Sequence, residues 1–378
     1  MPTASSSDSS PQGTLILTNP GDFHSFVVSE ALRKKGHGVW EWYTGDFPSL
    51  QTASALLTQD GVHWEASGPE FVVEDIRPRS VWVRGPSPPV VPASVAPADQ
   101  SFALRECRKF LNGLFQNAGC EAFWINSVAG ASRADVKMEQ LKAAAKSGFR
   151  VPRTLCSNDP DRIRRFIRDN HGPVIYKSFY PVSWEIADGV AALFSSEVTE
   201  ADLPDDASLQ AVPGIYQVKV PKAYELRITA IGETLIAAKL DSQAVPSAKL
   251  DWRAARDPVP LTPIAIPESL ANACRAIMAD LGIVFGCFDL IVTPEGETVF
   301  LEVNEAGSFL WIEEQNPEFR LLDAFCEFLL QGRTGFKWSE SPSSVRFHDV
   351  EADALHRMKN EAPRLHIEKP SNTQRDEI

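Results

Sequence analysis

The sequence predicts an α/β protein of about two to three domains. The chain opens on a strand, a helix and a second strand, and two pairs of apolar strands joined by short turns lie in its second half. Amphipathic helices separate these strands, and such alternation is typical of domains in which helices cover a sheet. A length of 378 residues is enough to bury a large core.

Composition excludes several classes of function. The chain has 37 Lys and Arg against 50 Asp and Glu, and its net charge of -13 argues against nucleic-acid binding, which depends on basic patches. The longest apolar runs are far shorter than the ~20 residues of a membrane span. Residues 1–13 lack the basic and apolar parts of a secretory signal, so we expect a disordered leader and a cytoplasmic protein. The six cysteines are scattered, which indicates reduced thiols rather than a zinc site.

The first domain is expected at residues 14–125. Its opening strand begins at Thr14 and leads into a helix that ends at Gly36, the position of a C-terminal cap. A later buried strand begins at Ser80 and is stopped by prolines. The other elements predicted here are a strand at 37–43, a helix at 101–119 and a strand at 121–127.

Helices and hairpins are expected to follow. From about residue 337 the apolar periodicity is lost, so we expect a flexible tail with at most one short helix. The elements predicted before the tail are a helix at 133–147, a helix capped by Asn158 or Asp159 that runs to Ile167, strands at 172–179 and 215–220, a hairpin at 224–240 that turns at Gly232-Glu233, a helix at 267–282, a hairpin at 286–304 that turns at Pro294-Glu295-Gly296, and a helix at 318–331.

The hairpin at 286–304 carries three oxygen-bearing side chains. Glu302 and Asn304 are two residues apart, so both point to one face of a strand. A hairpin centred near Glu295 places Asp289 almost opposite Glu302. Hard oxygen donors of this kind suit Mg²⁺. The alternative interpretation is a hairpin with a polar solvent face.

Several cations lie in or near predicted strands. Lys177 stands between apolar residues and needs an anionic partner, which is either an ATP phosphate or a structural salt bridge. Lys137 follows the strand at 121–127, and the guanidinium groups of Arg227 and Arg253 suit phosphate or a carboxylate substrate. No histidine lies between His171 and His348, and no pattern of a catalytic Ser or Cys or of a zinc protease occurs, so the chemistry is expected to use cations and a metal.

The order of these motifs resembles the ATP-grasp ligases, and within them the microviridin-type, or graspetide, ligases that modify ribosomally made peptides. The likeness covers about residues 14–332 and rests on several separated strings. These strings are SVWVRGPSPP, NSVAGASRADVKMEQLKAAAKSGFRVPRTLCSNDP, VPKAYELRITAIGETLIAAKLDSQ, LDWR and FLEVNEAGSFLWIEE.

The resemblance implies an ATP-grasp fold preceded by an open α/β domain. It implies a central lobe at 126–218 and a C-terminal lobe with the Mg²⁺ site at 219–335, followed by the tail at 336–378. By the same resemblance, Lys137 and Lys177 would hold ATP phosphates, and Arg227 and Arg253 would stabilise the charge on the transferred phosphoryl group. Mg²⁺ would be held by Asp289, Glu302 and Asn304. The residues that would line adenine are Gln217, Val218, Lys219 and Val220, and those that would face the ribose or phosphate side of the nucleotide are Lys222 and Glu225.

The implied function is an ATP-dependent carboxylate ligase acting on a precursor peptide. Asp or Glu side chains in the core of that peptide, which follows a leader, would become acyl phosphates, and Thr, Ser or Lys side chains would close lactone or lactam rings. Members of the family often form dimers, so a homodimer is expected. Two alternatives stay open: a ligase of the same fold that joins an amino acid to the end of a peptide or protein, and a non-catalytic nucleotide-binding module. The string VNEAG departs from the VNPNG that is more usual in this branch.

Overall fold

A computed structural model describes residues 13–69, 71–170, 172–179, 183–186, 189–192, 195–255 and 257–368. Apart from Gly13, the predicted leader lies outside these residues. The chain forms two compact units, which are taken one at a time below. Unit 1 comprises Met1–Ser127, Ile231–Thr234 and Ser308–Ile378, and unit 2 comprises Val128–Ala230 and Leu235–Gly307. No helix among the described residues is both long enough and apolar enough to span a membrane.

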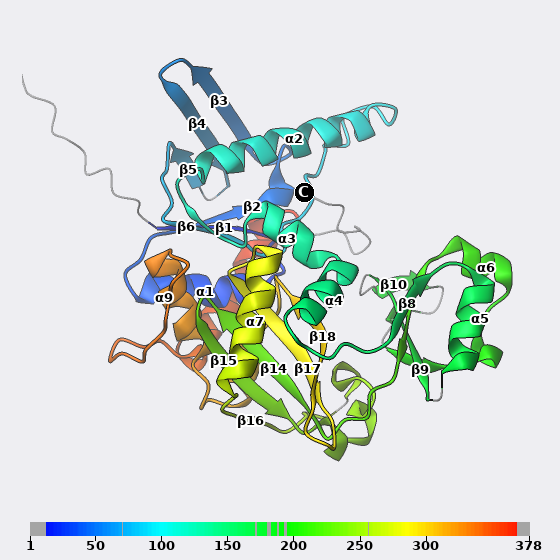
Figure 1. The fold of residues 1–378 in the computed structure, drawn as a ribbon. Helices are drawn as coiled ribbons and strands as arrows, with labels where there is room; N and C mark the ends of the chain where they lie inside the picture. Colours follow the sequence, from blue (N-terminus) through cyan, green and yellow to red (C-terminus); the bar gives the residue numbers. More distant parts are fainter. Residues whose placement is uncertain are drawn as a thin grey trace, which may run out of the picture. The chain divides into compact units, whose positions relative to one another are not determined.

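Unit 1 contains the predicted opening sheet (Figure 1). Four parallel strands lie in the order β2-β1-β6-β7. Their bounds are Thr14–Thr18 for β1, Val39–Tyr43 for β2, Ser80–Val83 for β6 and Phe123–Ile125 for β7, and the helices of the same region are α1 (Phe23–Lys34) and α2 (Gln100–Ala118). Asp22 caps α1 by accepting the Ser25 N–H, and Gly36 follows it with φ +76°, which confirms the predicted helix end.

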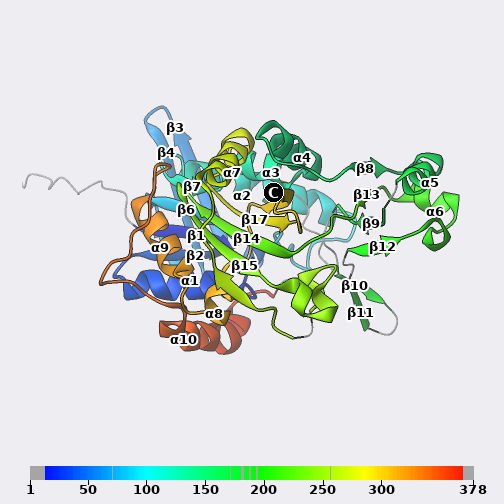
Figure 2. The ribbon, with the colours of Figure 1, turned by 60° about the horizontal axis from the view of Figure 1, so that its bottom comes forward.

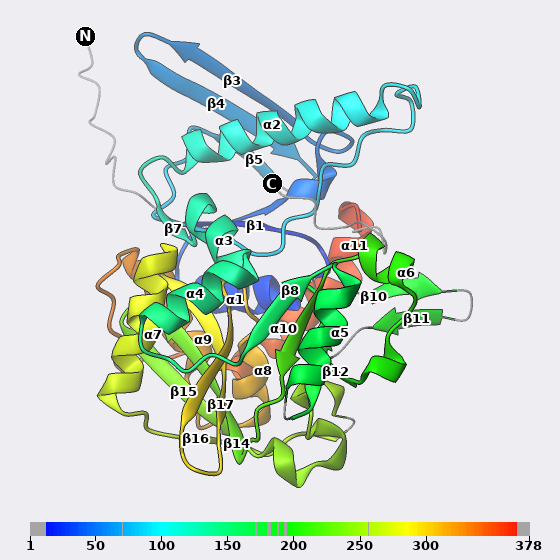
Figure 3. The ribbon, with the colours of Figure 1, turned by 45° about the vertical axis from the view of Figure 1, so that its right-hand side comes forward.

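A second, antiparallel sheet in unit 1 was not predicted. It consists of β3 (Thr52–Thr58), β4 (Gly61–Gly68) and β5 (Phe71–Glu74), and α2 lies along it (Figure 3). Only one face is buried: Trp64 and Ala66 pack in a cluster with Leu114 and Phe115 of α2. The sequence pattern was too weak to predict these strands, because the exposed Leu56 and Leu57 interrupt the alternation of apolar and polar residues that marks a strand.

The C-terminal part of the chain is packed as far as residue 368, the last that the structure describes, in place of the flexible tail expected from residue 336. Helix α9 (Leu321–Gln331) belongs to unit 1, where Phe325 contacts Trp82 with ring centroids 4.9 Å apart, so the predicted grouping of 308–335 with the C-terminal lobe is not observed. Beyond it, His366 Nδ1 lies 2.7 Å from Asp46 Oδ2, and both side chains are fully buried. The remaining elements are α8 (Leu310–Gln315), η6 (Phe347–Asp349), α10 (Glu351–His356), a π-helical turn η7 (Arg357–Glu361) and α11 (Ala362–Leu365).

These elements escaped prediction because each is only one or two turns long. Arg357 joins this C-terminal segment to the N-terminal part of unit 1 by ion pairs with Glu30 and Glu41, both at 2.7 Å. Contacts of this kind join positions more than 300 residues apart, so they leave no local periodicity.

Unit 2 contains a small sheet in the order β12-β9-β13-β8, covered by α5 and α6 (Figure 3). Asp159 caps α5 by accepting the Arg162 N–H, as predicted. The bounds are Thr154–Ser157 for β8, Val174–Lys177 for β9, Ser196–Val198 for β12, Gly214–Val218 for β13, Pro160–Asp169 for α5, Asp206–Ala211 for α6 and Glu200–Asp202 for the 3₁₀ turn η2, and Ser183–Ile186 (β10) pairs with Gly189–Ala192 (β11).

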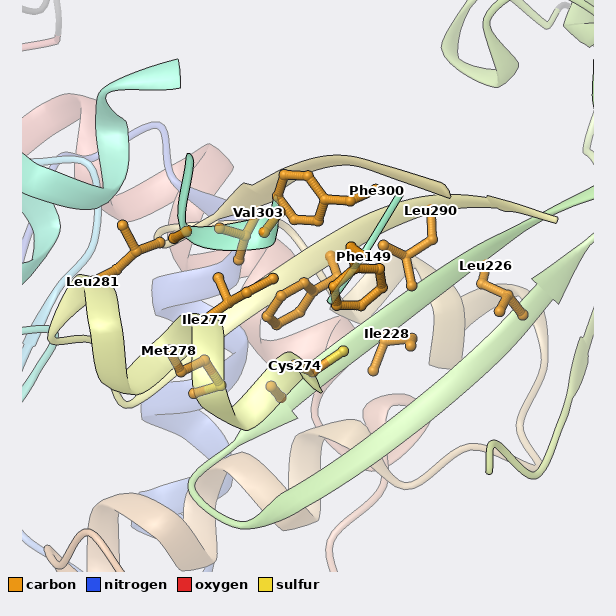
Figure 4. Packing of buried hydrophobic residues seen from close by; sticks show 14 of the residues in the cluster. Phe149, Leu226, Ile228, Cys274, Ile277, Met278, Leu281, Leu290, Phe300 and Val303 are labelled. Atoms are coloured by element: carbon orange, nitrogen blue, oxygen red, sulfur yellow. The ribbon is translucent and has the colours of Figure 1, made fainter. Parts of the chain in front are cut away.

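The larger sheet of unit 2 has five strands in the order β16-β15-β14-β17-β18 (Figure 1), of which β15, β14 and β17 are labelled in Figure 2. Its apolar face packs on α7, where Ile277 and Met278 lie against Phe149, Leu290 and Phe300 (Figure 4). Both predicted hairpins are present. The bounds are Tyr224–Ile231 for β14, Thr234–Leu240 for β15, Leu261–Pro263 for β16, Phe285–Val292 for β17, Thr298–Asn304 for β18 and Glu268–Leu281 for α7, with 3₁₀ turns at Ser242–Ala244, Pro246–Ala248 and Trp252–Ala254.

The helix predicted at 133–147 is two helices, α3 (Val128–Asp135) and α4 (Lys137–Lys146). The break is at Val136, which has an extended conformation with ψ 104°. Lys137 therefore stands in the first turn of a new helix. Gln140 reaches back across the break, because its Nε2 donates to Ala134 O at 2.5 Å.

The packed C-terminal segment makes a stability prediction. We expect His366→Ala to lower the free energy of unfolding by about 1–3 kcal/mol, because the buried Asp46 carboxylate loses a partner. His356→Ala is the matched control, since its side chain is 66% exposed and we expect a change within about 0.5 kcal/mol. Equal denaturant midpoints for the two variants would show that the segment does not stabilise unit 1.

Candidate functional site

The hairpin of β17 and β18 brings two carboxylates together through a β-bulge. Asp289 pairs with Glu302 as predicted, but the next pair is Leu290 with Phe300, so Leu301 is an extra residue in β18. Phe300 and Val303 point into the apolar core, while Leu301, Glu302 and Asn304 line a cavity. Without the bulge, Glu302 would share the face of Phe300, because residues two apart in a strand point the same way.

Cationic side chains from three other segments surround the two carboxylates. Lys137 Nζ in α4 lies 2.7 Å from Glu302 Oε2, and Arg227 Nη1 in β14 lies 2.8 Å from Asp289 Oδ2. Arg253 Nη1 lies 3.7 Å from Glu302 Oε1. These cations come from positions far apart in the sequence, so only the folded unit 2 brings them together.

The two carboxylates respond to this environment in opposite directions. Burial disfavours the charged form of both, but the positive charges of Lys137 and Arg253 outweigh it at Glu302 and lower its pKa to about 2. Burial raises the pKa of Asp289, because Arg227 offsets it only in part and the neighbouring Glu302 charge adds to it. A further cation between the two carboxylates would therefore be favourable.

The donor set fits Mg²⁺. Asp289, Glu302 and Asn304 supply hard oxygen atoms to one cavity, and no cluster of three or more His, Cys, Asp and Glu occurs in the described part of the chain. Two carboxylates and one amide leave room in an octahedral shell for water and phosphate oxygens, which is how proteins usually hold Mg²⁺. Zinc sites are characteristically built on Cys and His ligands, which Asp289, Glu302 and Asn304 do not supply.

Lys177 is held by neutral groups. Its Nζ donates to Gln217 Oε1 at 2.9 Å, and Gln217 Nε2 donates to Thr154 Oγ1 at 2.9 Å, so three adjacent strands share one network. Burial lowers the pKa of Lys177, and the nearby charge of Arg253 lowers it further. Among the described residues no carboxylate forms an ion pair with Lys177, so the salt-bridge interpretation has no partner in this structure.

Lys222 is a different kind of lysine. Its Nζ lies 2.8 Å from Glu225 Oε1 and donates to Leu250 O at 2.9 Å, and both side chains of the ion pair are less than a tenth exposed. Burial raises the pKa of Glu225. These two residues therefore satisfy one another, although both also line the cavity.

These groups, apart from Thr154 and Arg227, line one cavity of about 350 Å³ in unit 2. Arg227 is 5% exposed, is paired with Asp289 and is not part of the lining, and its role toward a transferred phosphoryl group stays a prediction. Apolar side chains of Ile175, Ile291 and Leu301 form part of the wall. The predicted residues found in the lining are Lys137, Lys177, Gln217, Val218, Lys219, Val220, Lys222, Glu225, Arg253, Asp289, Glu302 and Asn304.

Sequence reasoning missed Asp251, which orients Arg253. The two oxygens of Asp251 accept from Nε and Nη2 of Arg253, both at 2.9 Å, and Oδ1 also accepts the Arg253 N–H at 3.1 Å. This fork fixes the plane of the guanidinium group and leaves Nη1 toward Glu302. The Asp-x-Arg spacing in LDWR was the available signal.

The chain matches no protein-family model and no curated protein in sequence. Its structure is similar to the macrocyclase MdnC of Microcystis aeruginosa MRC bound with precursor peptide MdnA, with 27% identity, a TM-score of 0.74 and coverage of 85% of this chain and 100% of that one. A RiPP-associated ATP-grasp ligase of Chryseobacterium gregarium, in complex with ADP and a leader and core peptide, gives 25% identity and a TM-score of 0.76 over 89% and 99% of the two chains.

The macrocyclase MdnB of Microcystis aeruginosa MRC is also similar, with 28% identity, a TM-score of 0.71 and coverage of 85% of this chain and 100% of that chain. The structural neighbours of the chain are therefore RiPP-associated ATP-grasp ligases, where RiPP denotes a ribosomally made and modified peptide. The ATP-grasp fold and the resemblance seen in the sequence are confirmed.

The two lysines are expected to behave oppositely on substitution. Lys177→Met should not lower thermal stability, because it removes a charge that is disfavoured by burial and has no carboxylate partner among the described residues. Lys222→Met should lower the free energy of unfolding by about 3 kcal/mol, because Glu225 is left buried and unpaired. Thermal unfolding of Lys177→Met and Lys222→Met, each compared with wild type, tests these two expectations.

Proton linkage provides the control for Lys177. The pKa of Lys177 is lower in the folded than in the unfolded chain, so between these two pKa values the unfolded chain binds more protons. The free energy of unfolding of wild type should therefore rise with pH in the range that ends at 10.5. In Lys177→Met the free energy of unfolding should rise less with pH over the same range. A variant less stable than wild type, with unchanged pH dependence, would assign Lys177 to a structural ion pair.

Proposed function

We propose that this chain, which has the ATP-grasp fold, is an ADP-forming ligase that closes ester or amide rings in a ribosomal precursor peptide. The observation that carries the proposal is the single cavity in which Asp289, Glu302 and Asn304 face Lys137, Lys177 and Arg253. Support also comes from the similar enzymes, since MdnC is a macrocyclase bound with its precursor peptide and the Chryseobacterium ligase is in complex with ADP, leader and core.

The cavity supplies separate surfaces for the parts of ATP. Lys137 and Lys177 carry positive charge that suits phosphate oxygens, and the apolar side chains of Ile175, Ile291 and Leu301 suit the adenine ring. Mg²⁺, held by Asp289, Glu302 and Asn304, would act as a Lewis acid that neutralises phosphate charge. Arg227, paired with Asp289 behind the cavity, would orient that carboxylate rather than contact the nucleotide.

The first chemical step would activate a carboxylate. An Asp or Glu oxygen of the peptide attacks the γ-phosphorus, the bond from that phosphorus to the bridging oxygen breaks, and ADP leaves with the electron pair. Arg253, whose plane is fixed by Asp251, offsets negative charge on the transferred group. Lys177 acts in the same way on phosphate oxygens, since no carboxylate among the described residues forms an ion pair with it.

The second step would close the ring. A Thr or Ser hydroxyl, or a Lys amine, of the same peptide attacks the acyl carbon, the bond from that carbon to the phosphate oxygen breaks, and phosphate leaves with the electron pair and takes up the proton that the nucleophile loses. Since nucleophile and acyl group share one chain, the effective concentration is high. The peptide loses one water for each ring formed.

The partner is a precursor peptide with a leader and a core that carries Asp or Glu together with Thr, Ser or Lys. The homodimer, the cytoplasmic location and the lack of nucleic-acid or membrane partners stay predictions from the sequence, supported by the net charge of -13 for the nucleic-acid case.

The reaction itself is the first test. Enzyme, Mg²⁺, ATP and the candidate precursor are incubated, the peptide is weighed by mass spectrometry and the nucleotide product is identified. We expect loss of one water per ring together with ADP and phosphate. A gain of one amino-acid residue would favour the terminal ligase instead, formation of AMP and pyrophosphate would overturn the acyl-phosphate mechanism, and unchanged ATP with specific nucleotide binding would favour the non-catalytic module.

Asn304 gives the sharpest test of the metal assignment, because it is exposed and makes little contribution to packing. We expect Asn304→Ala to abolish product formation at ordinary Mg²⁺ while the thermal unfolding midpoint stays unchanged. Asn272→Ala, an exposed asparagine of α7 in the same unit, is the matched control and should leave the rate unchanged. Normal turnover by Asn304→Ala at limiting Mg²⁺ would remove Asn304 from the site.

A further inference from the structure

Strand β18 is an edge strand, and this creates a structural problem. It stands last in the five-stranded sheet, so its outward N–H groups have no neighbouring strand to bind. A buried N–H without a partner costs free energy. The bulge at Leu301 interrupts the ladder just where Glu302 and Asn304 must be held in place.

Two groups from the segment before β8 satisfy this edge. Arg150 O accepts the Phe300 N–H at 3.0 Å. Gln140 Oε1 accepts the Val303 N–H at 3.1 Å, in a bond between buried groups. Val303 stands directly between Glu302 and Asn304, so this second bond lies at the centre of the proposed metal strand.

Gln140 is itself tightly held. It is 1% exposed, and its amide nitrogen donates to Ala134 O at 2.5 Å, across the break between α3 and α4. The orientation of the side chain is therefore set: the nitrogen must face Ala134 and the oxygen must face Val303. A freely rotating side chain could not fix a strand in this way.

Lys137 and Gln140 are three residues apart in α4, so they lie on one face of the helix. From this face Lys137 binds the Glu302 carboxylate and Gln140 binds the Val303 backbone. The break at Val136 sets the direction in which this face points, because α4 starts anew at Lys137.

We infer that Gln140 is a positioning residue of the ligase reaction, which holds the backbone between Glu302 and Asn304 so that both side chains face the cavity. The inference rests on the proposed function, since it assigns Glu302 and Asn304 to Mg²⁺. Gln140 is not among the residues that line the cavity, so it would act through the backbone of β18. Outer groups that orient metal ligands typically change metal affinity or activity by about 10- to 100-fold when removed.

Three variants separate this role from packing. Gln140→Met keeps the volume but has no oxygen acceptor, and Gln140→Asn keeps the amide but is one methylene too short to reach Val303. Gln140→Glu keeps an oxygen acceptor at the right length but loses the N–H donor to Ala134 O. Lys142→Met, a solvent-exposed position on the same helix with a side chain 75% exposed, is the control.

We expect Gln140→Met and Gln140→Asn to raise the Mg²⁺ concentration needed for half-maximal ring formation by about 10- to 100-fold, with a smaller change in kcat at saturating Mg²⁺. Gln140→Glu should recover only part of the Mg²⁺ response, because its carboxylate can accept from Val303 but cannot donate to Ala134 O, and Lys142→Met should match wild type. A merely structural residue would instead lower the amount of folded enzyme and leave the Mg²⁺ response of the remainder unchanged.

Amide hydrogen exchange supplies a readout that needs no activity. In Gln140→Met and Gln140→Asn the segment 298–304 should exchange faster than in wild type, Gln140→Glu should lie between these two variants and wild type, and Lys142→Met should not change the exchange. If wild type closes no rings, the proposed function fails and exchange still tests the contact with Val303. The inference is wrong if wild type closes rings and both Gln140→Met and Gln140→Asn keep the wild-type Mg²⁺ response and the wild-type exchange of segment 298–304. If one of these two variants does not fold, the result for the other decides.

Discussion

Two carboxylates side by side in a buried hairpin are the constraint on which the rest of unit 2 depends. Asp289 and Glu302 face one another across β17 and β18, and like charges so placed repel unless cations surround them. Lys137, Arg227 and Arg253 supply this charge from a helix, a strand and a turn. The cations are unevenly placed: Glu302 lies near both Lys137 and Arg253, whereas Asp289 is paired with Arg227.

One inserted residue decides which side chains reach the cavity. The bulge at Leu301 moves Glu302 from the core face to the cavity face and lets Phe300 and Val303 stay in the apolar core. Such a bulge disturbs the ladder of an edge strand, so the strand needs support from outside the sheet. Arg150 and Gln140 provide it. Geometry at the site thus depends on α4 as much as on the sheet that carries the carboxylates.

The lysines of the cavity illustrate the difference between groups kept for stability and groups kept for chemistry. Lys222 and Glu225 neutralise one another, so removal of either leaves an unpaired buried charge. Lys177 is bound only by the neutral Gln217 among its described partners, and its burial disfavours the charge that it carries. A cost of this kind is common where a protein prepares a surface for an anion, because the ligand supplies the missing charge.

The sequence by itself determined the local elements and the pattern of the site. Strand periodicity put Glu302 and Asn304 on one face, turn residues located both hairpins, and the order of the motifs indicated the ATP-grasp fold that the structural neighbours confirm. Only the tertiary structure decided the break at Val136, the bulge at Leu301, the place of Arg227 behind Asp289, and the packing of the C-terminal segment through Arg357 and His366. Each of these features depends on contacts between residues far apart in the chain. Such contacts satisfy buried charges and N–H groups, and so they override local propensity. Sequence periodicity reflects only the pattern among neighbouring residues.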